Sequence, residues 1–195
     1  MVSPRPSARQ RLLDAADRLF YAEGVHTVGI DRIIAEAGVA KGSLFYNFSG
    51  KDELVAAYLA TRYERRRHLT LQLQERHDDP VDRLLAAFDV VQEAASSPSY
   101  NGCPFANANA EARPDGVESE ALRTFRDWLG AMFLTLATEG GFADPADVAD
   151  RLRVLYDGAV ATAQLDHQPG AVRLARELAA AVLASSPRVA VDAEG

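Results

Sequence analysis

A run of polar and aromatic side chains between residues 41 and 47 offers the chemistry of nucleic-acid recognition. A helix face of this kind carries a cation for phosphate, hydroxyl and amide groups for base edges, and rings for contact with thymine methyl groups. The side chains on this face are Lys41, Ser43, Phe45, Tyr46 and Asn47. Their types and spacing favour a helix that reads the major groove of DNA.

Two short helices joined by a tight turn must position that face. Apolar residues recur at i, i+3, i+4 and i+7 from Ile30 to Ala37, which predicts a helix of about two turns. Gly38 can take the left-handed conformation that ends a helix, and Leu44 and Phe48 anchor the second helix. The sequence therefore predicts a helix-turn-helix, although two amphipathic helices around a glycine also occur in helical proteins of other function.

The residues around this turn match a known pattern. The turn reads Ala37-Gly38-Val39, the run Lys41-Gly42-Ser43-Leu44-Phe45 follows, and Phe48, Lys51, Asp52 and Glu53 come next. This pattern resembles the DNA-binding domain of the TetR (tetracycline-repressor-like) family. The resemblance implies that DNA is contacted by Lys41, Gly42, Ser43, Phe45, Tyr46 and Asn47, with Lys51 on a phosphate.

Three positions depart from the family pattern, and each removes a side-chain hydrogen bond. Ala40 stands where a serine or threonine usually caps the second helix, a loss of about 1 kcal/mol. Phe45 replaces a tyrosine and cannot hydrogen-bond to phosphate, and Val28-Gly29 replaces capping threonines. We therefore expect Thr27, Arg32 or backbone amides at the helix starts to compensate.

Composition indicates an ordinary globular protein with a less acidic N-terminal part. Of 195 residues, 48% are hydrophobic and 25% charged, and the net charge is −7. Residues 1–75 hold 11 Lys+Arg and 9 Asp+Glu, net +2, whereas the remaining 120 hold 10 and 19, net −9. An N-terminal DNA-binding part that is less acidic than the rest of the chain, called the head below, can approach phosphate. With no apolar run of membrane-spanning length and no signal-peptide core, we expect a cytoplasmic protein without a membrane segment.

Helix signals continue to the C-terminus, without strand-like alternation or an internal repeat. We expect an all-α fold in which residues 1–50 form a three-helix helix-turn-helix DNA-binding domain. Residues 51–186 form a larger helical effector-binding and dimerisation domain, and residues 187–195 a flexible tail. This order of helices also fits the plan that the TetR resemblance implies.

Local signals mark several of the expected helices. Ser7 with Gln10, and Ser49 with Asp52, form capping patterns at helix starts. Asp79-Pro80 opens another helix. The helix that starts near Ser49 carries four arginines in its middle, Arg62, Arg65, Arg66 and Arg67. They either form a solvated helix face or belong to a helix that connects the two domains.

Aromatic and polar residues beyond the head are candidates for a small-molecule pocket. They suit a mainly apolar cavity with one or two polar contacts, and they suit core packing equally well. The candidates are Phe88, Cys103, Phe105, Asn107, Phe125, Trp128, Met132 and Phe133. The TetR resemblance implies a pocket for a small-molecule effector in this domain without placing individual residues. Such an effector would weaken DNA binding by changing the spacing of two heads.

The last two predicted helices are candidates for a dimer interface. A head this small reads few base pairs, so we expect a homodimer on a palindromic operator in double-stranded DNA. The interface residues would be Leu152, Leu155, Tyr156, Ala159, Val160, Ala163, Ala175, Leu178, Ala179 and Val182. They would form a four-helix interface or else pack within one subunit, and the TetR resemblance favours the dimer.

Two other functions are supported by less of the sequence. An enzyme would need a paired nucleophile and base, but nothing pairs Cys103 with a histidine, and no phosphate-binding loop or metalloprotease motif is present. A redox switch at Cys103 is a further alternative, although a lone buried cysteine usually acts as a small hydrophobe. We expect no cofactor and no metal. The sequence therefore predicts a DNA-binding transcriptional regulator released by an effector, a repressor more readily than an activator.

Overall fold

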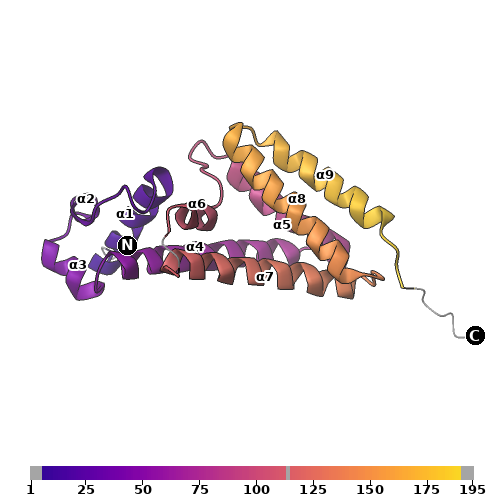
Figure 1. The fold of residues 1–195 in the computed structure, drawn as a ribbon, viewed down its shortest axis with the longest axis horizontal. Coiled ribbons are helices and arrows are strands. Elements are labelled where there is room, and N and C mark those ends of the chain that lie inside the picture. Colours follow the sequence, from indigo (N-terminus) through magenta and orange to yellow (C-terminus); the bar gives the residue numbers. More distant parts are fainter. Residues whose placement is uncertain (1–5, 113–114, 190–195) are drawn as a thin grey trace, which may run out of the picture. The chain divides into compact units, whose positions relative to one another are not determined.

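The computed structural model describes residues 6–112 and 115–189. Over these residues the chain forms nine helices and no strand, so the predicted all-α class is confirmed. The helices are α1 (Ala8–Glu23), α2 (Ile30–Ala37), α3 (Lys41–Asn47), α4 (Lys51–Gln74), α5 (Pro80–Ala95), α6 (Pro104–Ala110), α7 (Val117–Glu139), α8 (Pro145–Leu165) and α9 (Gly170–Ser185) (Figure 1). None of these helices is both long enough and apolar enough to cross a membrane.

The helices belong to two compact units. The first unit combines the described residues up to Glu64 with Cys103–Thr124, and the second combines Arg65–Gly102 with the described residues from Phe125 onward. Helices α1, α2, α3 and α6 therefore lie in the first unit, and α5, α8 and α9 in the second. Helices α4 and α7 contribute residues to both.

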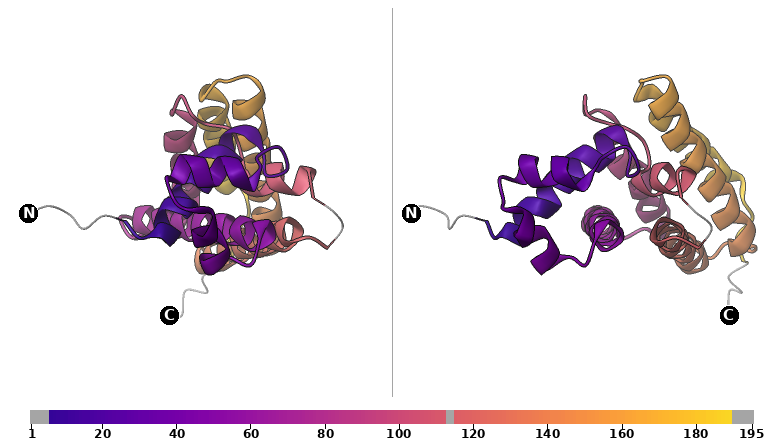
Figure 2. Two further views of the ribbon diagram at one scale, coloured as in Figure 1. Left: turned by 90° about the vertical axis from the view of Figure 1, so that its left-hand side faces the viewer. Right: turned by 60° about the vertical axis from the view of Figure 1, so that its left-hand side comes forward.

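Helices α1, α2 and α3 pack on one another in the first unit (Figures 1 and 2). Ser7 caps α1 as predicted, because its side chain accepts a hydrogen bond from the Gln10 N–H at 3.2 Å. The Gln10 amide donates to Asp14 at 2.8 Å. The core of the three helices includes Leu12, Ala16, Phe20, Ile33, Ile34, Leu44 and Phe48.

The turn between α2 and α3 depends on a glycine and on a distant arginine. Gly38 has φ 60° and ψ 42°, the left-handed conformation predicted for it. The Arg11 guanidinium of α1 donates to the Gly38 carbonyl at 2.9 Å and to the Ala37 carbonyl at 3.3 Å. Arg11 thereby satisfies carbonyl groups at the end of α2 that have no partner within the helix.

At the start of helix α4, the side chain that accepts the hydrogen bond from the Ser49 N–H is one residue later in the chain than the sequence predicts. The Ser49 N–H donates to Glu53 Oε2 at 2.6 Å, whereas the predicted capping pattern names Asp52. Glu53 is one residue farther into the helix, and its longer side chain reaches back to the amide. This contact lowers the pKa of Glu53, mainly because the carboxylate accepts the backbone hydrogen bond.

In the second unit, α8 and α9 lie side by side and antiparallel, and both pack on α5 (Figures 1 and 2). Asp79 caps α5, as predicted, by accepting from the Val81 N–H at 2.8 Å. Three buried rings form an aromatic cluster, with centroids 6.4 Å apart for Phe88 and Phe133, 5.9 Å for Phe88 and Tyr156, and 6.2 Å for Phe133 and Tyr156.

The chain after α9 returns to the end of α7. The Ala143 N–H donates to the Pro187 carbonyl at 2.9 Å, and the Val189 N–H donates to the Gly141 carbonyl at 2.8 Å. Arg188 lies over the Phe142 ring, 3.8 Å from its centroid. The predicted tail begins at residue 187, so its first three residues form this bridge, and residues 190–195 lie outside the described part of the chain.

Candidate functional site

Helix α3 presents its aromatic side chains to solvent. Tyr46 is 90% exposed and Phe45 is 54% exposed, although large aromatic residues are usually buried to a greater extent. Leu44, and Phe48 directly after the helix, are buried and fix the opposite face. The helix is therefore anchored on one side and open on the other, the arrangement that a groove-reading helix requires.

Two polar side chains of α3, those of Lys41 and Asn47, already have partners within the chain. The Asn47 amide donates to the Ser43 carbonyl at 2.7 Å, and both residues are half-buried. The Lys41 ammonium lies 2.9 Å from Asp31 Oδ1 at the start of α2. Gly42 is exposed, and a side chain there would meet no atom within 4 Å. Backbone and ring surfaces are thus more accessible on α3 than its amide group.

The remaining predicted DNA contacts flank α3. Arg32 forms two hydrogen bonds with Glu23, one of them 2.7 Å from Nη2 to Oε1, and these bonds raise the pKa of Arg32. The Lys51 ammonium donates to the His26 carbonyl at 3.4 Å. Thr27 is exposed in the loop between α1 and α2.

All nine predicted DNA-contacting residues lie in the first unit. Six are exposed, namely Thr27, Arg32, Lys41, Gly42, Phe45 and Tyr46. Three are half-buried, namely Ser43, Asn47 and Lys51. The structure therefore brings the predicted set together on α3 and its flanks, with the aromatic pair as its most prominent apolar feature.

Neither helix of the motif has a side-chain N-cap. Gly29 precedes α2 and Ala40 precedes α3, and neither residue provides a side-chain hydrogen bond to the first turn. The predicted absence of a cap at Ala40 is thus confirmed. No side-chain cap therefore occupies the first backbone N–H groups of α2 and α3, so an external acceptor would not have to displace one.

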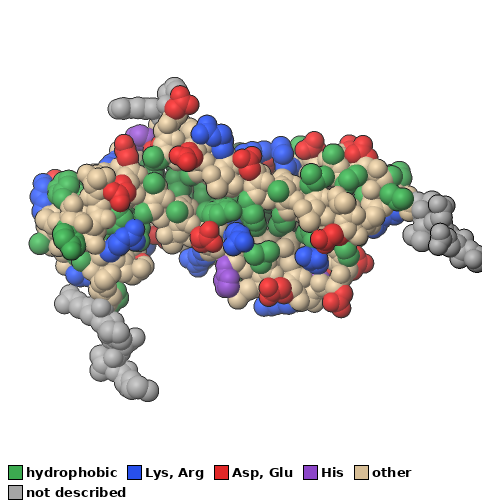
Figure 3. Space-filling model, turned by 90° about the horizontal axis from the view of Figure 1, so that it is seen from below, with side chains coloured by type: hydrophobic (Ala, Val, Ile, Leu, Met, Phe, Trp, Pro, Cys, Tyr) green, Lys and Arg blue, Asp and Glu red, His purple; other side chains and the backbone are tan. Residues whose placement is uncertain are grey.

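Side chains of both charges occur on the face of the molecule shown in Figure 3. On the face shown in Figure 3, Lys and Arg side chains are interspersed with Asp and Glu, and apolar side chains are exposed among them at the left-hand end, where Figure 1 places α3. Several cations of the first unit have carboxylate partners, including the pair of Arg18 and Glu36 at 3.0 Å. The head therefore differs from a uniformly basic DNA-binding surface.

Two arginines that support the motif were not identified from the sequence. Arg11 binds the carbonyl groups at the end of α2, and Arg9 lies over the Phe48 ring, 4.9 Å from its centroid. Both side chains belong to α1, some 26 to 39 residues before their partners, so no local pattern predicts the contacts. The only signal in the sequence for these contacts was the presence of both arginines in the first turns of α1.

The loop between α1 and α2 is held by two carboxylates from later in the chain. Glu111, at the end of α6, accepts from the His26 N–H at 3.0 Å. Glu118, a buried residue of α7, lies 3.6 Å from the His26 imidazole. A side chain added at Gly24 would come within 2.5 Å of the Glu111 carboxylate. The position of this loop therefore depends on α6 and on the start of α7, within the same unit.

The eight predicted pocket residues divide between the two units. Cys103, Phe105 and Asn107 lie in the first unit, and the other five lie in the second, namely Phe88, Phe125, Trp128, Met132 and Phe133. Phe88 and Phe133 are fully buried against each other and Tyr156. The Met132 sulfur lies 3.3 Å from the Gln74 amide. The packing of Phe88 and Phe133 is that of core residues.

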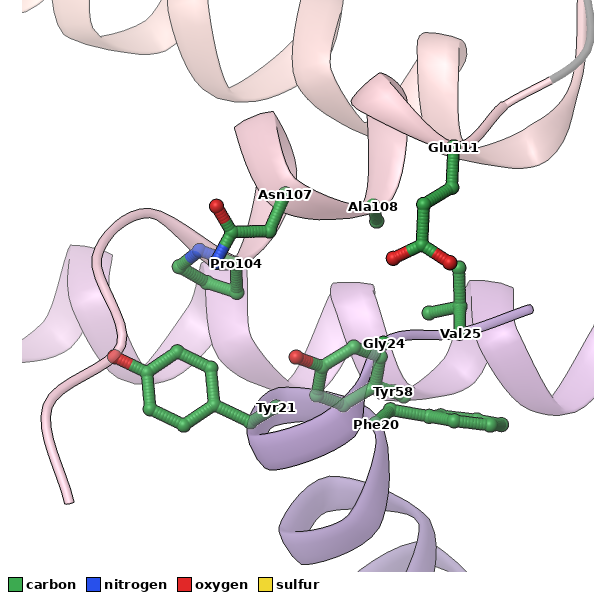
Figure 4. A pocket seen from close by; sticks show the side chains of 9 residues that line it. All are labelled: Phe20, Tyr21, Gly24, Val25, Tyr58, Pro104, Asn107, Ala108 and Glu111. Atoms are coloured by element: carbon green, nitrogen blue, oxygen red, sulfur yellow. The ribbon is translucent and has the colours of Figure 1, made fainter. Parts of the chain in front are cut away.

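A small hollow in the first unit is lined by one of the predicted pocket residues, Asn107. It encloses about 190 Å³, including space open to solvent, and its lining is Phe20, Tyr21, Gly24, Val25, Tyr58, Pro104, Asn107, Ala108 and Glu111 (Figure 4). Burial raises the pKa of Tyr58, whose ring forms one wall. The hollow is smaller than the 300 to 1,000 Å³ typical, roughly, of ligand pockets. In this state it has too little room for a drug-sized molecule.

Most of the predicted interface residues are buried within the subunit. Six of the ten are buried, namely Leu152, Tyr156, Ala159, Ala163, Ala175 and Ala179. Leu155, Val160 and Val182 are half-buried, and Leu178 is exposed. Besides Leu178, the exposed large apolar residues of α8 and α9 are Val154, Leu165 and Leu174, which the prediction did not include. The helices α8 and α9 use the predicted face mainly to pack against each other and α5.

Metal-ligating residues do not gather anywhere in the ranges 6–112 and 115–189: no group of three or more His, Cys, Asp or Glu side chains could hold a metal ion there. Cys103 is half-buried and precedes α6, where its sulfur accepts from the Ala106 N–H at 3.5 Å. The sulfur thus serves as the N-cap of a short helix.

Comparisons with known proteins agree with this geometry. Residues 12–58 match the family model for bacterial regulatory proteins of the tetR family, and residues 80–179 match that for the tetracyclin repressor-like C-terminal domain. The uncharacterised HTH-type transcriptional regulator YxaF of Bacillus subtilis (strain 168) is 30% identical over 166 residues, which cover 82% of this chain and 84% of that protein.

Solved structures resemble the whole fold. SCO4454, a TetR-family transcriptional regulator from Streptomyces coelicolor, is 34% identical with a TM-score of 0.86, covering 91% of this chain and 94% of that chain. A TetR transcriptional regulator from Chloroflexus aurantiacus is 25% identical with a TM-score of 0.83, covering 94% and 97% of the two chains.

Proposed function

This chain belongs to the TetR family of DNA-binding transcriptional regulators, and we propose that it binds a palindromic operator as a homodimer and leaves it when a small molecule binds. Repression that an effector relieves is typical of that family. The observation that carries the proposal for this chain is the exposed face of α3, with two aromatic side chains turned to solvent on a helix anchored by Leu44 and Phe48.

The nine residues around α3 divide into two roles in this proposal. Phe45 and Tyr46 contact base edges and thymine methyl groups in the major groove, because their rings are the most exposed apolar surface there. Lys41, Arg32 and Lys51 contact phosphates, as do the open backbone groups at Gly42 and the hydroxyl of Thr27. Ser43 and Asn47 contact DNA after the Asn47 amide has rotated away from the helix backbone.

Selection of bound duplexes from a random DNA pool tests this function first. We expect the purified protein to enrich a palindromic sequence at physiological salt, because two identical heads read two half-sites. Tyr46→Ala should weaken binding to the selected duplex about 5- to 150-fold for each head, and binding to a scrambled duplex far less, since a base contact is worth about 1–3 kcal/mol. Retention of all sequences alike would contradict the proposal.

The dimer forms, in this proposal, through the exposed face of α8 and α9. Val154 and Leu165 are 72% and 78% exposed on α8, and Leu174 and Leu178 are 56% and 48% exposed on α9. Large apolar residues exposed together on adjacent helices are a usual mark of an interaction site. Proteins of the family typically act as dimers, so a second copy of this chain is the partner that we assign to the face.

A charge placed on this face should separate the subunits. Val154→Glu puts a carboxylate within the proposed interface, and sedimentation velocity should then report a monomer. Ala131→Glu, at an exposed position of α7, is the matched control and should remain a dimer. A dimeric Val154→Glu protein that retains wild-type affinity for the palindrome would exclude this face.

The effector binds the helical body in this proposal, residues 51–186, whereas residues 1–50 read DNA. Asn107 is the predicted pocket residue that lines the hollow of Figure 4, and Tyr58 and Glu111 share that lining. The size of the hollow means that a ligand must enlarge it or bind elsewhere in the body. A thermal-shift screen of small aromatic molecules, followed by an operator-release assay with wild type and Asn107→Leu, separates the two cases.

The same proposal assigns the protein to the cytoplasm, where the bacterial chromosome lies. Fluorescence of the tagged chain over the nucleoid would support this assignment, and exclusion from the nucleoid would oppose it. Transcription from the neighbouring promoter, with and without the gene, distinguishes a repressor from an activator.

A further inference from the structure

Two carboxylates hold cations that DNA phosphate would have to bind. Asp31 binds Lys41, and Glu23 binds Arg32, in the same unit that carries the exposed face of α3. A DNA-binding head usually leaves such cations available, because counterion release from phosphate supplies much of its affinity. The charges of Lys41 and Arg32 are therefore neutralised locally, on and next to the groove-reading helix.

The pair of Asp31 and Lys41 links the starts of two helices. Asp31 is the second residue of α2, and Lys41 is the first residue of α3. A cation at a helix N-terminus is disfavoured by the helix dipole, and a carboxylate there is favoured. The Asp31 carboxylate, 2.9 Å from the Lys41 ammonium, offsets the unfavourable position of that ammonium.

We propose that Asp31 competes with DNA phosphate for Lys41 and thereby limits the affinity of the head for any duplex. This rests on the proposed function, in which Lys41 contacts a phosphate. The exchange is feasible because both side chains are mainly solvent-exposed, 68% for Lys41 and 81% for Asp31. An exposed pair of this kind is weak and screened by salt, so a phosphate can replace the carboxylate.

The competition should be independent of DNA sequence. Phosphate contacts carry no base information, so Asp31 reduces binding to the operator and to scrambled DNA by the same factor. Removing an exposed pair of this strength should improve affinity about threefold for each subunit, or about tenfold for a dimer. Each phosphate contact that becomes fully effective should also steepen the dependence of log K on log salt by about 0.9.

Two other roles for Asp31 predict different results. If its carboxylate accepts a hydrogen bond from a cytosine amino group, its removal changes preference at one base pair. If it merely repels phosphate over a distance, its removal improves binding whether or not Lys41 is present. Both can be separated from competition for Lys41 by combining two substitutions.

The experiment uses the wild-type chain, Asp31→Asn, Lys41→Ala and the double variant. Asparagine preserves the shape of Asp31 and removes its charge. Glu36→Gln is the matched control, because it removes one carboxylate from the same helix while its partner, Arg18, is outside the proposed DNA contacts. Fluorescence anisotropy gives Kd for the selected operator and a scrambled duplex of equal length, from about 50 to about 200 mM salt. Circular dichroism confirms that each variant is folded.

The proposal expects Asp31→Asn to bind both duplexes about tenfold more tightly as a dimer, with a steeper salt dependence, and Glu36→Gln to change little. In the Lys41→Ala background, Asp31→Asn should have no effect. An equal gain without Lys41, a gain on one duplex only, or weaker binding by folded Asp31→Asn would each overturn it. If wild type selects no DNA sequence, the proposed function itself fails, and that result is read from wild type alone.

Discussion

Replacing Arg62 tests how a half-buried ion pair stabilises the first unit. Arg62 binds the Asp17 carboxylate through two hydrogen bonds, one of them 2.9 Å from Nη2. Its guanidinium also lies over the Tyr21 ring, 4.1 Å from the centroid, and 5.7 Å from that of Tyr58. The Arg62 side chain is 19% exposed and that of Asp17 is 31% exposed, so water replaces these contacts only in part.

The expected loss follows from those contacts. Hydrogen bonds between charged groups contribute about 1.5–3 kcal/mol, and a cation over a ring adds about 0.5–1 kcal/mol. Partial hydration of Asp17 reduces the cost of leaving it unpaired. We therefore expect Arg62→Met, which keeps an apolar stem, to lower the free energy of unfolding by about 2–3 kcal/mol. Arg62→Lys should lose about 1 kcal/mol, because an ammonium cannot form the same fork.

Urea unfolding followed by circular dichroism measures these differences. The matched control is Arg18→Met, which breaks the pair with Glu36, where the side chains are 58% and 47% exposed. That change should cost at most about 0.5 kcal/mol. Equal losses for Arg62→Met and Arg18→Met would refute the argument from burial. A loss that persists unchanged for Arg62→Met in an Asp17→Asn background would refute the assignment of Asp17 as the main partner.

Three further changes test single features of the fold. Gly24→Ala should destabilise the protein by about 1–2 kcal/mol, because residue 24 has a φ of 93°. Adding Glu111→Ala to that variant should relieve only the steric clash between the new methyl group and the Glu111 carboxylate. Urea unfolding of the single and double variants will measure both effects. Because the Ser49 N–H lowers the pKa of Glu53, that carboxylate stabilises the fold above the ordinary glutamate pKa of about 4.3 and loses this effect as the pH falls through its lowered value. Melting temperatures of wild type and Glu53→Gln should therefore differ at pH 7 and converge in acid, whereas a constant difference would contradict the linkage. Asp79→Ala removes the N-cap of α5 and should cost about 1 kcal/mol; Asp79→Asn should restore most of it.

Local signals in the sequence predicted the helices of this protein well. Gly38, Asp79 and Ser7 each mark a helix boundary in the structure, because the conformation or hydrogen bond that each supplies is set within a few residues. The exposed face of α3 was also predictable, since Leu44 and Phe48 leave the intervening side chains on the other side. These contacts span at most one helical turn.

Contacts between distant residues could not be predicted in the same way. Arg11 reaches the end of α2 across 27 residues, and Arg62 reaches Asp17 across 45. From the sequence, one interpretation of Arg62 was that it lies on a solvated helix face. Periodicity gives the position of a side chain on its own helix, but it does not identify the residues of other helices that contact it. Carboxylates are similarly hard to assign: no local pattern pairs Asp31 with Lys41, and only the fold brings the two side chains together.

The aromatic pocket residues show a related limit. Phe88 and Phe133 were candidates because large apolar side chains suit a ligand cavity and a core equally well. In the structure they pack against each other and Tyr156, which the sequence assigned to the dimer interface. Hydrophobic character predicted that all three are buried, and only the tertiary fold identifies what buries them.

Helix α8 explains why the predicted and proposed dimer faces differ. Its buried residues Leu152, Tyr156, Ala159 and Ala163 follow a spacing of four, three and four. Its exposed residues Val154, Gly158, Ala161 and Leu165 follow the same spacing, two positions later. Two positions rotate an α-helix by about 200°, so these are opposite faces of one helix. The sequence favoured the face with more large apolar residues, which α9 and α5 already cover. The opposite face has small residues between two large ones, and small residues allow a second helix to approach closely. That combination leaves it the better surface for another copy of the chain.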